Sequence, residues 1–148
     1  MTAHLWFDAE HTHAAAGVFL LTKDDRLVLQ LRDDIPNIDN PGMITTFGGQ
    51  AEPNETAIDC ALREIAEETG LQADPSDLRY LGSVSKRDWR GNMTACVFFV
   101  LADIDSSALV ITEGTAVTLS RVEVVDDPRL TLTCRAMAAK IEIFGDLV

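Results

Sequence analysis

The chain has few basic residues and no long apolar run, and both shortages exclude classes of protein. Only 12 of its 148 residues are Lys or Arg, against 24 Asp or Glu, which gives a formal net charge of −12. This acidic net charge argues against binding to a nucleic-acid polymer or an anionic membrane, because both bind basic protein surfaces. No apolar run reaches the roughly 20 residues of a membrane-spanning helix. We therefore expect a partner that is a small molecule.

Cysteine is also scarce. Cys60, Cys96 and Cys134 are widely spaced and form no CxxC pair, which is the pattern of neither a disulfide framework nor a zinc site. We expect buried free thiols in a reducing compartment. The first residues have neither the basic start nor the apolar core of a secretory signal, so we expect a cytoplasmic protein. The length predicts a single domain over residues 1–148.

The order of the expected elements indicates the fold class. Alternating and apolar segments predict strands, and a 3.6-residue periodicity ending at a glycine predicts the clearest helix. The expected strands cover residues 14–22, 26–32, 78–86, 93–102 and 116–122, with a short extended segment at 43–47. The expected helices cover 56–69 and 129–144, the second with Pro128 in its first turn. This order predicts an α+β fold, an α/β/α sandwich around a mixed sheet.

The helix expected at 56–69 carries an unusual concentration of acid. On a helical wheel Glu64, Glu67 and Glu68 share one narrow face, beside an apolar stripe of Ile58, Leu62 and Ile65. Like charges at these spacings repel, and the C-terminal half of a helix favours cations. A bound Mg²⁺ or Mn²⁺ would offset both the repulsion between the carboxylates and their unfavourable interaction with the helix dipole. The alternative is a solvated acidic face, and either interpretation places Glu68 at the surface.

Neighbouring residues favour the metal interpretation. Arg63 lies four residues from both Asp59 and Glu67, so it can pair with either and fix a carboxylate. Upstream, Gly48-Gly49 allows a backbone to approach a ligand closely, and Glu55 adds a carboxylate beside that turn.

Residues 49–71, GQAEPNETAIDCALREIAEETGL, fit the pattern G-x5-E-x7-R-E-U-x-E-E-x-G-U, in which U is a bulky aliphatic residue. This segment resembles the signature of the Nudix hydrolase family at all nine specified positions, with no insertion. It covers about a sixth of the chain. The stretch from LVLQLRDD through PGMITTFGG is also similar to family members.

The resemblance implies a Nudix-type α/β/α sandwich and an Mg²⁺- or Mn²⁺-dependent hydrolase. Its substrate would be a nucleoside diphosphate linked to another moiety, such as a nucleoside triphosphate or a nucleotide sugar. By the same resemblance Glu64, Glu67 and Glu68 are metal ligands, and Glu64 is also a candidate general base. Arg63 and Glu55 would orient them. Family members are often dimers, so a homodimer is a further expectation.

Glu113 is our candidate for a further metal ligand. Family members often draw one more carboxylate from outside the signature, and Glu113 lies in ITEGTAV, just before an expected strand. A surface turn residue is the alternative, because loops supply functional groups yet are mostly solvated.

Substrate-binding candidates lie in the loops and at strand ends. Arg32 could bind a phosphate, and Gly48 and Gly49 could approach the ligand. Trp89, in the polar segment KRDWRG, could stack on a base. The same role for Trp6 and Phe47 is weaker, since aromatic residues are more often in the core.

Two other functions are compatible with a Nudix fold. A non-catalytic nucleotide-sensing module usually has a damaged signature or a DNA-binding element, whereas this signature is intact and the charge is wrong for DNA. Isopentenyl-diphosphate isomerisation would need a cysteine and histidines near TTFGGQAEP, where this sequence has none. The sequence alone does not select one nucleotide derivative.

Overall fold

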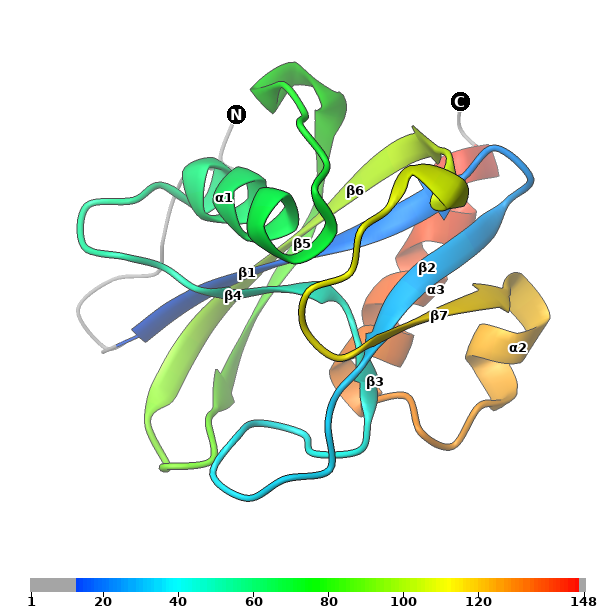
Figure 1. The fold of residues 1–148 in the computed structure, drawn as a ribbon. Coiled ribbons are helices and arrows are strands. Elements are labelled where there is room, and N and C mark those ends of the chain that lie inside the picture. Colours follow the sequence, from blue (N-terminus) through cyan, green and yellow to red (C-terminus); the bar gives the residue numbers. More distant parts are fainter. Residues whose placement is uncertain (1–12, 147–148) are drawn as a thin grey trace.

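The computed structural model describes residues 13–146, which form a seven-stranded sheet with helices on both faces (Figure 1). The strands are β1 (His13–Thr22), β2 (Arg26–Leu31), β3 (Ile44–Thr45), β4 (Phe47–Gln50), β5 (Leu78–Arg87), β6 (Met93–Ile104) and β7 (Thr115–Ser120). The helices are α1 (Ala57–Thr69), α2 (Arg121–Asp126) and α3 (Leu132–Asp146), with 3₁₀ turns at Pro75–Asp77 and Ser106–Ala108.

The sheet is mixed, as the sequence predicts. β1 runs parallel to β6 and antiparallel to β2 and β4, and the other pairs are antiparallel. Along one edge, β1 pairs with β4 as far as Val18 and with β2 from Leu20 onward. The sheet therefore divides beside β3 and β4, which follow one another in the chain but pair with different strands.

Both faces of the sheet are buried. Alternate residues of β6 point to opposite sides, which explains why this strand is apolar throughout. Val97, Phe99 and Leu101 pack toward α1, whereas Cys96, Phe98 and Val100 pack toward α2 and α3. This two-sided packing confirms the α/β/α sandwich. No helix within residues 13–146 is long and apolar enough to cross a membrane.

The expected strand at 116–122 is too long at its C-terminal end, because α2 begins at Arg121. A reciprocal capping box starts this helix: the Glu123 N–H donates to Ser120 Oγ at 3.2 Å, and the Ser120 N–H donates to Glu123 Oε1 at 2.9 Å. The S-x-x-E spacing is a known helix-start signal that our sequence analysis missed.

The last helix also begins later than expected, at Leu132 instead of residue 129, so Pro128 lies outside it. Pro128 and Arg129 form a turn instead, and Leu130 then pairs in parallel with Ile44 at the edge of the sheet. The Ile44 N–H donates to the Arg129 carbonyl at 2.8 Å, and the Thr131 N–H donates to the Ile44 carbonyl at 3.1 Å. Thr131 Oγ1 then accepts from the Cys134 N–H at 3.1 Å, which caps the first turn.

The prediction of buried free thiols is confirmed for Cys60, Cys96 and Cys134. Burial raises the pKa of Cys60 and of Cys134 to about 12, so these thiols stay protonated near neutral pH.

Candidate functional site

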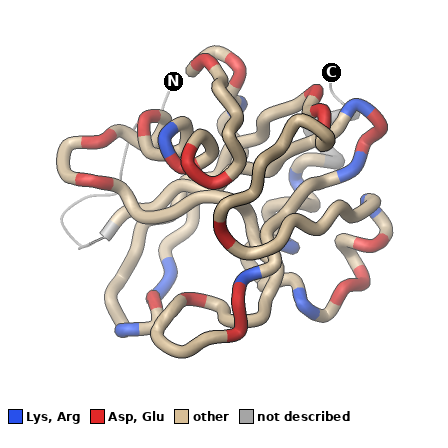
Figure 2. Tube along the Cα trace, viewed as in Figure 1, with Lys and Arg blue, Asp and Glu red and all other residues tan. Residues whose placement is uncertain are grey.

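Helix α1 begins and ends where the sequence predicts. Thr56 Oγ1 accepts a hydrogen bond from the Asp59 N–H at 3.1 Å, and Gly70 ends the helix in the left-handed conformation, with φ of 77°. Ile65 is buried against the sheet, and Ile58 packs partly buried beside it. Acidic residues outnumber basic ones on the rest of α1 and in the loops around it (Figure 2). One face therefore anchors the helix and the other presents carboxylates.

Arg63 joins three of these carboxylates. It makes a bidentate pair with Glu55, at 2.6 Å from Nε to Oε2 and 2.9 Å from Nη2 to Oε1. Its Nη1 donates to Glu64 at 2.8 Å and to Glu67 at 3.3 Å. The expected pair of Arg63 with Glu67 is thus present. In place of the alternative pair with Asp59, Arg63 binds Glu55 and Glu64. The Arg63 guanidinium lowers the pKa of the Glu55 carboxyl, so Glu55 stays ionised and keeps Arg63 in position.

Neighbouring atoms leave no space for a side chain at either Gly48 or Gly49. A Cβ on Gly49 would lie 2.7 Å from the Glu64 carboxyl carbon and 2.8 Å from both its oxygens. A Cβ on Gly48, whose φ is 150°, would lie 2.0 Å from the Ala16 carbonyl oxygen. The two glycines, which lie in strand β4 and not in the turn expected from the sequence, thus make room for Glu64. Burial raises the pKa of this carboxyl, and its hydrogen bond with Arg63 opposes the rise.

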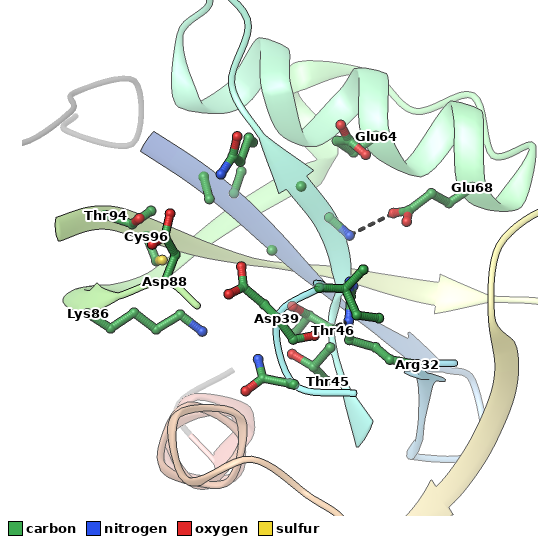
Figure 3. A pocket seen from close by; sticks show the side chains of 18 of the residues that line it. Arg32, Asp39, Thr45, Thr46, Glu64, Glu68, Lys86, Asp88, Thr94 and Cys96 are labelled. Atoms are coloured by element: carbon green, nitrogen blue, oxygen red, sulfur yellow. Dashed lines mark hydrogen bonds between the residues drawn. The ribbon is translucent and has the colours of Figure 1, made fainter. Parts of the chain in front are cut away.

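Glu68 is buried, with 3% of its surface exposed, so the expectation of a surface position is wrong. The Gly48 N–H donates to its Oε1 at 2.8 Å, the bond drawn in Figure 3, and Gln30 Nε2 donates to its Oε2 at 3.3 Å. Burial raises the pKa of Glu68, the Gly48 bond opposes this, and the nearby Glu113 carboxyl adds to the rise. An isolated helical wheel cannot show this, because other segments cover the side chain.

One of these covering segments follows β6 and closes the C-terminal end of α1. The Val110 N–H donates to the carbonyl of Thr69 at 2.9 Å. The Thr112 N–H donates to the Glu68 carbonyl at 3.1 Å, and Thr112 Oγ1 donates to the Glu67 carbonyl at 2.8 Å. These bonds satisfy carbonyls that a helix end leaves without partners, and they fix the segment that carries the next acidic residue.

Glu113 lies close to the helix carboxylates, as the sequence predicts. Its carboxyl influences the pKa of Glu68, and its backbone carbonyl accepts from Gln30 Nε2 at 3.1 Å. Gly114 then turns the chain with φ of 67°, where a Cβ would lie 2.7 Å from the Leu31 carbonyl oxygen. Its proximity to Glu68 favours the functional interpretation of Glu113 over a solvated turn.

A cavity of about 510 Å³ connects these residues with the substrate-binding candidates, and it lies where β3 and β4 separate. Glu64, Glu67, Glu68 and Glu113 line one part of it, and Lys86, Trp89 and Thr94 line another; Arg32, Gly48 and Gly49 also belong to the wall. In Figure 3, Glu64 and Glu68 enter from α1, and Lys86 and Thr94 from β5 and β6. The structure therefore gathers residues that are distant in the sequence around one space.

Arg32 and Trp89 are linked through Asp39. Arg32 Nε donates to the Asp39 carbonyl at 2.6 Å, and the Trp89 N–H donates to Asp39 Oδ1 at 2.8 Å. Asp39 thereby ties the loop after β2 to the turn between β5 and β6. Trp89 is 47% exposed, and the Arg90 guanidinium lies 4.8 Å from the centre of its indole ring. Phe47, by contrast, is fully buried in the core, and Trp6 lies outside the described residues.

Gln30 is a site residue that the sequence analysis missed. Only 1% of its surface is exposed, and its amide contacts both Glu68 and the Glu113 backbone. The available signal was a glutamine inside an otherwise apolar strand. Among the described side chains, no three Asp, Glu, Cys or His residues already form a group arranged to hold a metal ion. Gln30, Gly48 and Arg63 instead donate to the glutamates.

Comparison with known proteins identifies the family. The model of the NUDIX domain matches residues 11–126, well over half of the chain. The chain is 40% identical over 68 residues to an NAD-capped RNA hydrolase NudC from Vibrio parahaemolyticus, and 40% identical over 58 residues to a putative 8-oxo-dGTP diphosphatase from Bacillus subtilis. These segments cover 46% and 39% of this chain, but only 24% and 35% of the two relatives.

The fold is also similar to that of solved structures. A MutT protein from Methanosarcina mazei Go1 superposes with a TM-score of 0.77 at 15% sequence identity, over 94% of this chain and 99% of that one. At this identity the likeness supports the fold alone.

Proposed function

The chain belongs to the Nudix family, and on that premise we propose that it is a pyrophosphohydrolase that acts on a nucleoside diphosphate linked to another group. Neither aligned segment reaches two thirds of the relative's own length, so the activity rests on the site as well as on the family. A cytoplasmic location and a homodimer stay predictions.

One observation carries the proposal: four glutamates and an arginine line the same cavity. Glu64, Glu67, Glu68 and Glu113 supply the carboxylates, and Arg32 supplies the cation. A purely solvated acidic face would leave its carboxylates exposed, whereas Glu68 is buried and receives two hydrogen bonds. The fold therefore buries a carboxylate beside other carboxylates, which is electrostatically unfavourable. Such an arrangement is characteristic of functional sites.

These residues suit Mg²⁺ or Mn²⁺, since hard divalent cations prefer carboxylate oxygens. Glu64, Glu67, Glu68 and Glu113 would hold the metal, with Arg63 moving away from Glu67, which has the longer of the two Nη1 contacts. When bound, such a cation neutralises charge on the phosphates and lowers the pKa of a coordinated water.

The protein groups have distinct roles in this proposal. Arg32 would donate hydrogen bonds to a substrate phosphate, because a guanidinium matches phosphate oxygens in geometry and charge. Glu64 is the candidate to accept the proton of the attacking water. Glu55 would act indirectly, since its bidentate pair holds Arg63, and Arg63 in turn orients Glu64.

The relatives support a nucleotide as substrate. One is described as an NAD-capped RNA hydrolase and the other as a putative 8-oxo-dGTP diphosphatase. Both names denote action on a nucleotide that contains a phosphoanhydride.

The test is a panel of nucleoside triphosphates, nucleotide sugars and dinucleotides, assayed with and without Mg²⁺. Products are detected as phosphate released by an added phosphatase that does not attack the intact substrates. We expect Mg²⁺-dependent turnover of at least one compound class. Nucleotide binding without any turnover would overturn the proposal and support a sensing module instead.

A further inference from the structure

Two hydrogen-bond donors that have no partner among the described side chains line the cavity away from the glutamates. Lys86 of β5 and Thr94 of β6 are directly opposite each other in the antiparallel pair, so their side chains share one face of the sheet. Thr94 is 4% exposed, and its Oγ1 has no hydrogen-bond partner within the described part of the chain. Lys86 makes no ion pair with any carboxylate of residues 14–141. Both residues border the cavity (Figure 3).

A buried hydroxyl without a partner requires an explanation, because the great majority of buried polar groups are hydrogen-bonded. The nearby acidic residues have other partners. Asp39 Oδ1 accepts from the Trp89 N–H, and Asp88 Oδ1 accepts from the N–H groups of Arg90 and Asn92. The Cys96 thiol, which also borders the cavity, is kept protonated because burial raises its pKa. A ligand that places a hydrogen-bond acceptor in this part of the cavity would therefore pair with Lys86 and Thr94.

Trp89 indicates the shape of that ligand. Trp89 borders the same cavity and is 47% exposed, and Asp39 fixes its backbone. An accessible indole offers a flat apolar surface on which a planar ring can stack. A nucleobase that carries a carbonyl group has both features, a planar ring for Trp89 and an acceptor for Lys86 and Thr94.

We propose that Lys86 and Thr94 determine specificity by donating hydrogen bonds to a ring carbonyl oxygen of the substrate's nucleobase. This inference rests on the proposed function, because it assigns the base that is joined to the phosphates. An adenine-type base presents an exocyclic amino group at the corresponding position, so it would bring donors against donors. Polar sites of this kind discriminate strongly, because a mismatched ligand leaves their groups unpaired.

The experiment compares the binding of IMP and AMP by isothermal titration calorimetry. The two nucleotides carry the same phosphate and ribose but differ between a ring carbonyl and an amino group. We expect the wild-type protein to bind IMP about tenfold more tightly, as befits a hydrogen bond to a charged group. Lys86→Met should abolish the preference, and Thr94→Val should reduce it. Lys23→Met, in the turn between β1 and β2, is the matched control and should keep it.

Each result bears on the proposal. Equal weakening of IMP and AMP by Lys86→Met would show that Lys86 binds the phosphate, which overturns the assignment. An unchanged preference in both variants, a wild-type preference for AMP, or no binding of either nucleotide would also overturn it. Thr94→Val removes a hydroxyl without a partner, so its melting temperature should not fall, and loss of binding cannot then be attributed to unfolding.

The proposed function is tested separately on the same preparations. Turnover in the substrate panel without any base preference contradicts only the role of Lys86 and Thr94. A preference for IMP without turnover of any compound in the panel contradicts only the hydrolase.

Discussion

The buried amide of Gln30 donates a hydrogen bond to Oε2 of Glu68 at 3.3 Å. The same nitrogen donates to the backbone carbonyl of Glu113 at 3.1 Å, and Gln30 Oε1 lies 3.5 Å from Nη1 of Arg32. One side chain thus connects the carboxylate part of the site with the candidate phosphate-binding arginine.

We expect Gln30→Leu to weaken both metal binding and turnover. The change leaves two acceptors without their donor, which costs about 1–3 kcal/mol of stability for a buried group. Since Glu68 also loses alignment, the Mg²⁺ concentration that gives half-maximal activity should rise, and Mn²⁺ binding followed by electron paramagnetic resonance should weaken. Gln72→Leu, at an exposed position, is the control. Unchanged Mn²⁺ binding in Gln30→Leu would assign Gln30 a role in stability only.

Divalent cations should stabilise the protein. Because binding to the folded state raises stability by mass action, millimolar Mg²⁺ or Mn²⁺ should raise the melting temperature. The variant with Glu64→Gln, Glu67→Gln and Glu68→Gln should lose this response. An equal shift in both proteins, measured by differential scanning calorimetry, would mean that the cation binds elsewhere.

Glu113→Gln should lower kcat by roughly 10- to 1,000-fold with a smaller change in KM, if Glu113 completes the metal shell or holds the attacking water. Glu123 is unsuitable as a control, because its carboxylate caps the start of α2. Asp126→Asn, an exposed position at the end of that helix, is the better one. Similar kinetics of Glu113→Gln and Asp126→Asn would remove Glu113 from the site.

The buried thiols predict a dependence of stability on alkaline pH. Burial raises the pKa of Cys60 and of Cys134 from 9.0 to about 12, so the unfolded chain releases these protons at a lower pH than the folded protein. Their contribution is fully present below pH 9 and is lost between pH 9 and about 12. The melting temperature should fall over this range, less steeply in Cys134→Ala. Rapid labelling of the folded protein by a thiol reagent at pH 8 would contradict the burial.

Most of what the sequence predicted correctly is local, and most of what it left out depends on contacts between distant residues. Helix α1, its Thr56 cap and its Gly70 end follow from short-range rules. The burial of Glu68 does not, because it depends on Gln30 and on the segment that carries Glu113, 38 and 45 residues away.

The two errors at the C-terminal end have different origins. Helix α2 was missed although the Ser120–Glu123 capping signal is visible in the sequence. The late start of α3 depends instead on the pairing of Leu130 with Ile44, a contact that no local pattern reveals. The relation of Lys86 to Thr94 likewise required the register of β5 and β6.

The most direct test of the account is the turnover of Glu68→Gln beside that of the wild-type protein, at saturating Mg²⁺ on the best substrate of the panel. The amide can still accept from the Gly48 N–H, so the far-ultraviolet circular dichroism should match that of the wild type. If the glutamates of α1 hold the catalytic metal, kcat should fall at least about a hundredfold, since a metal-bound water and its charge stabilisation are lost. Near wild-type turnover by Glu68→Gln, or no Mg²⁺-dependent hydrolysis by the wild-type protein, would contradict the account.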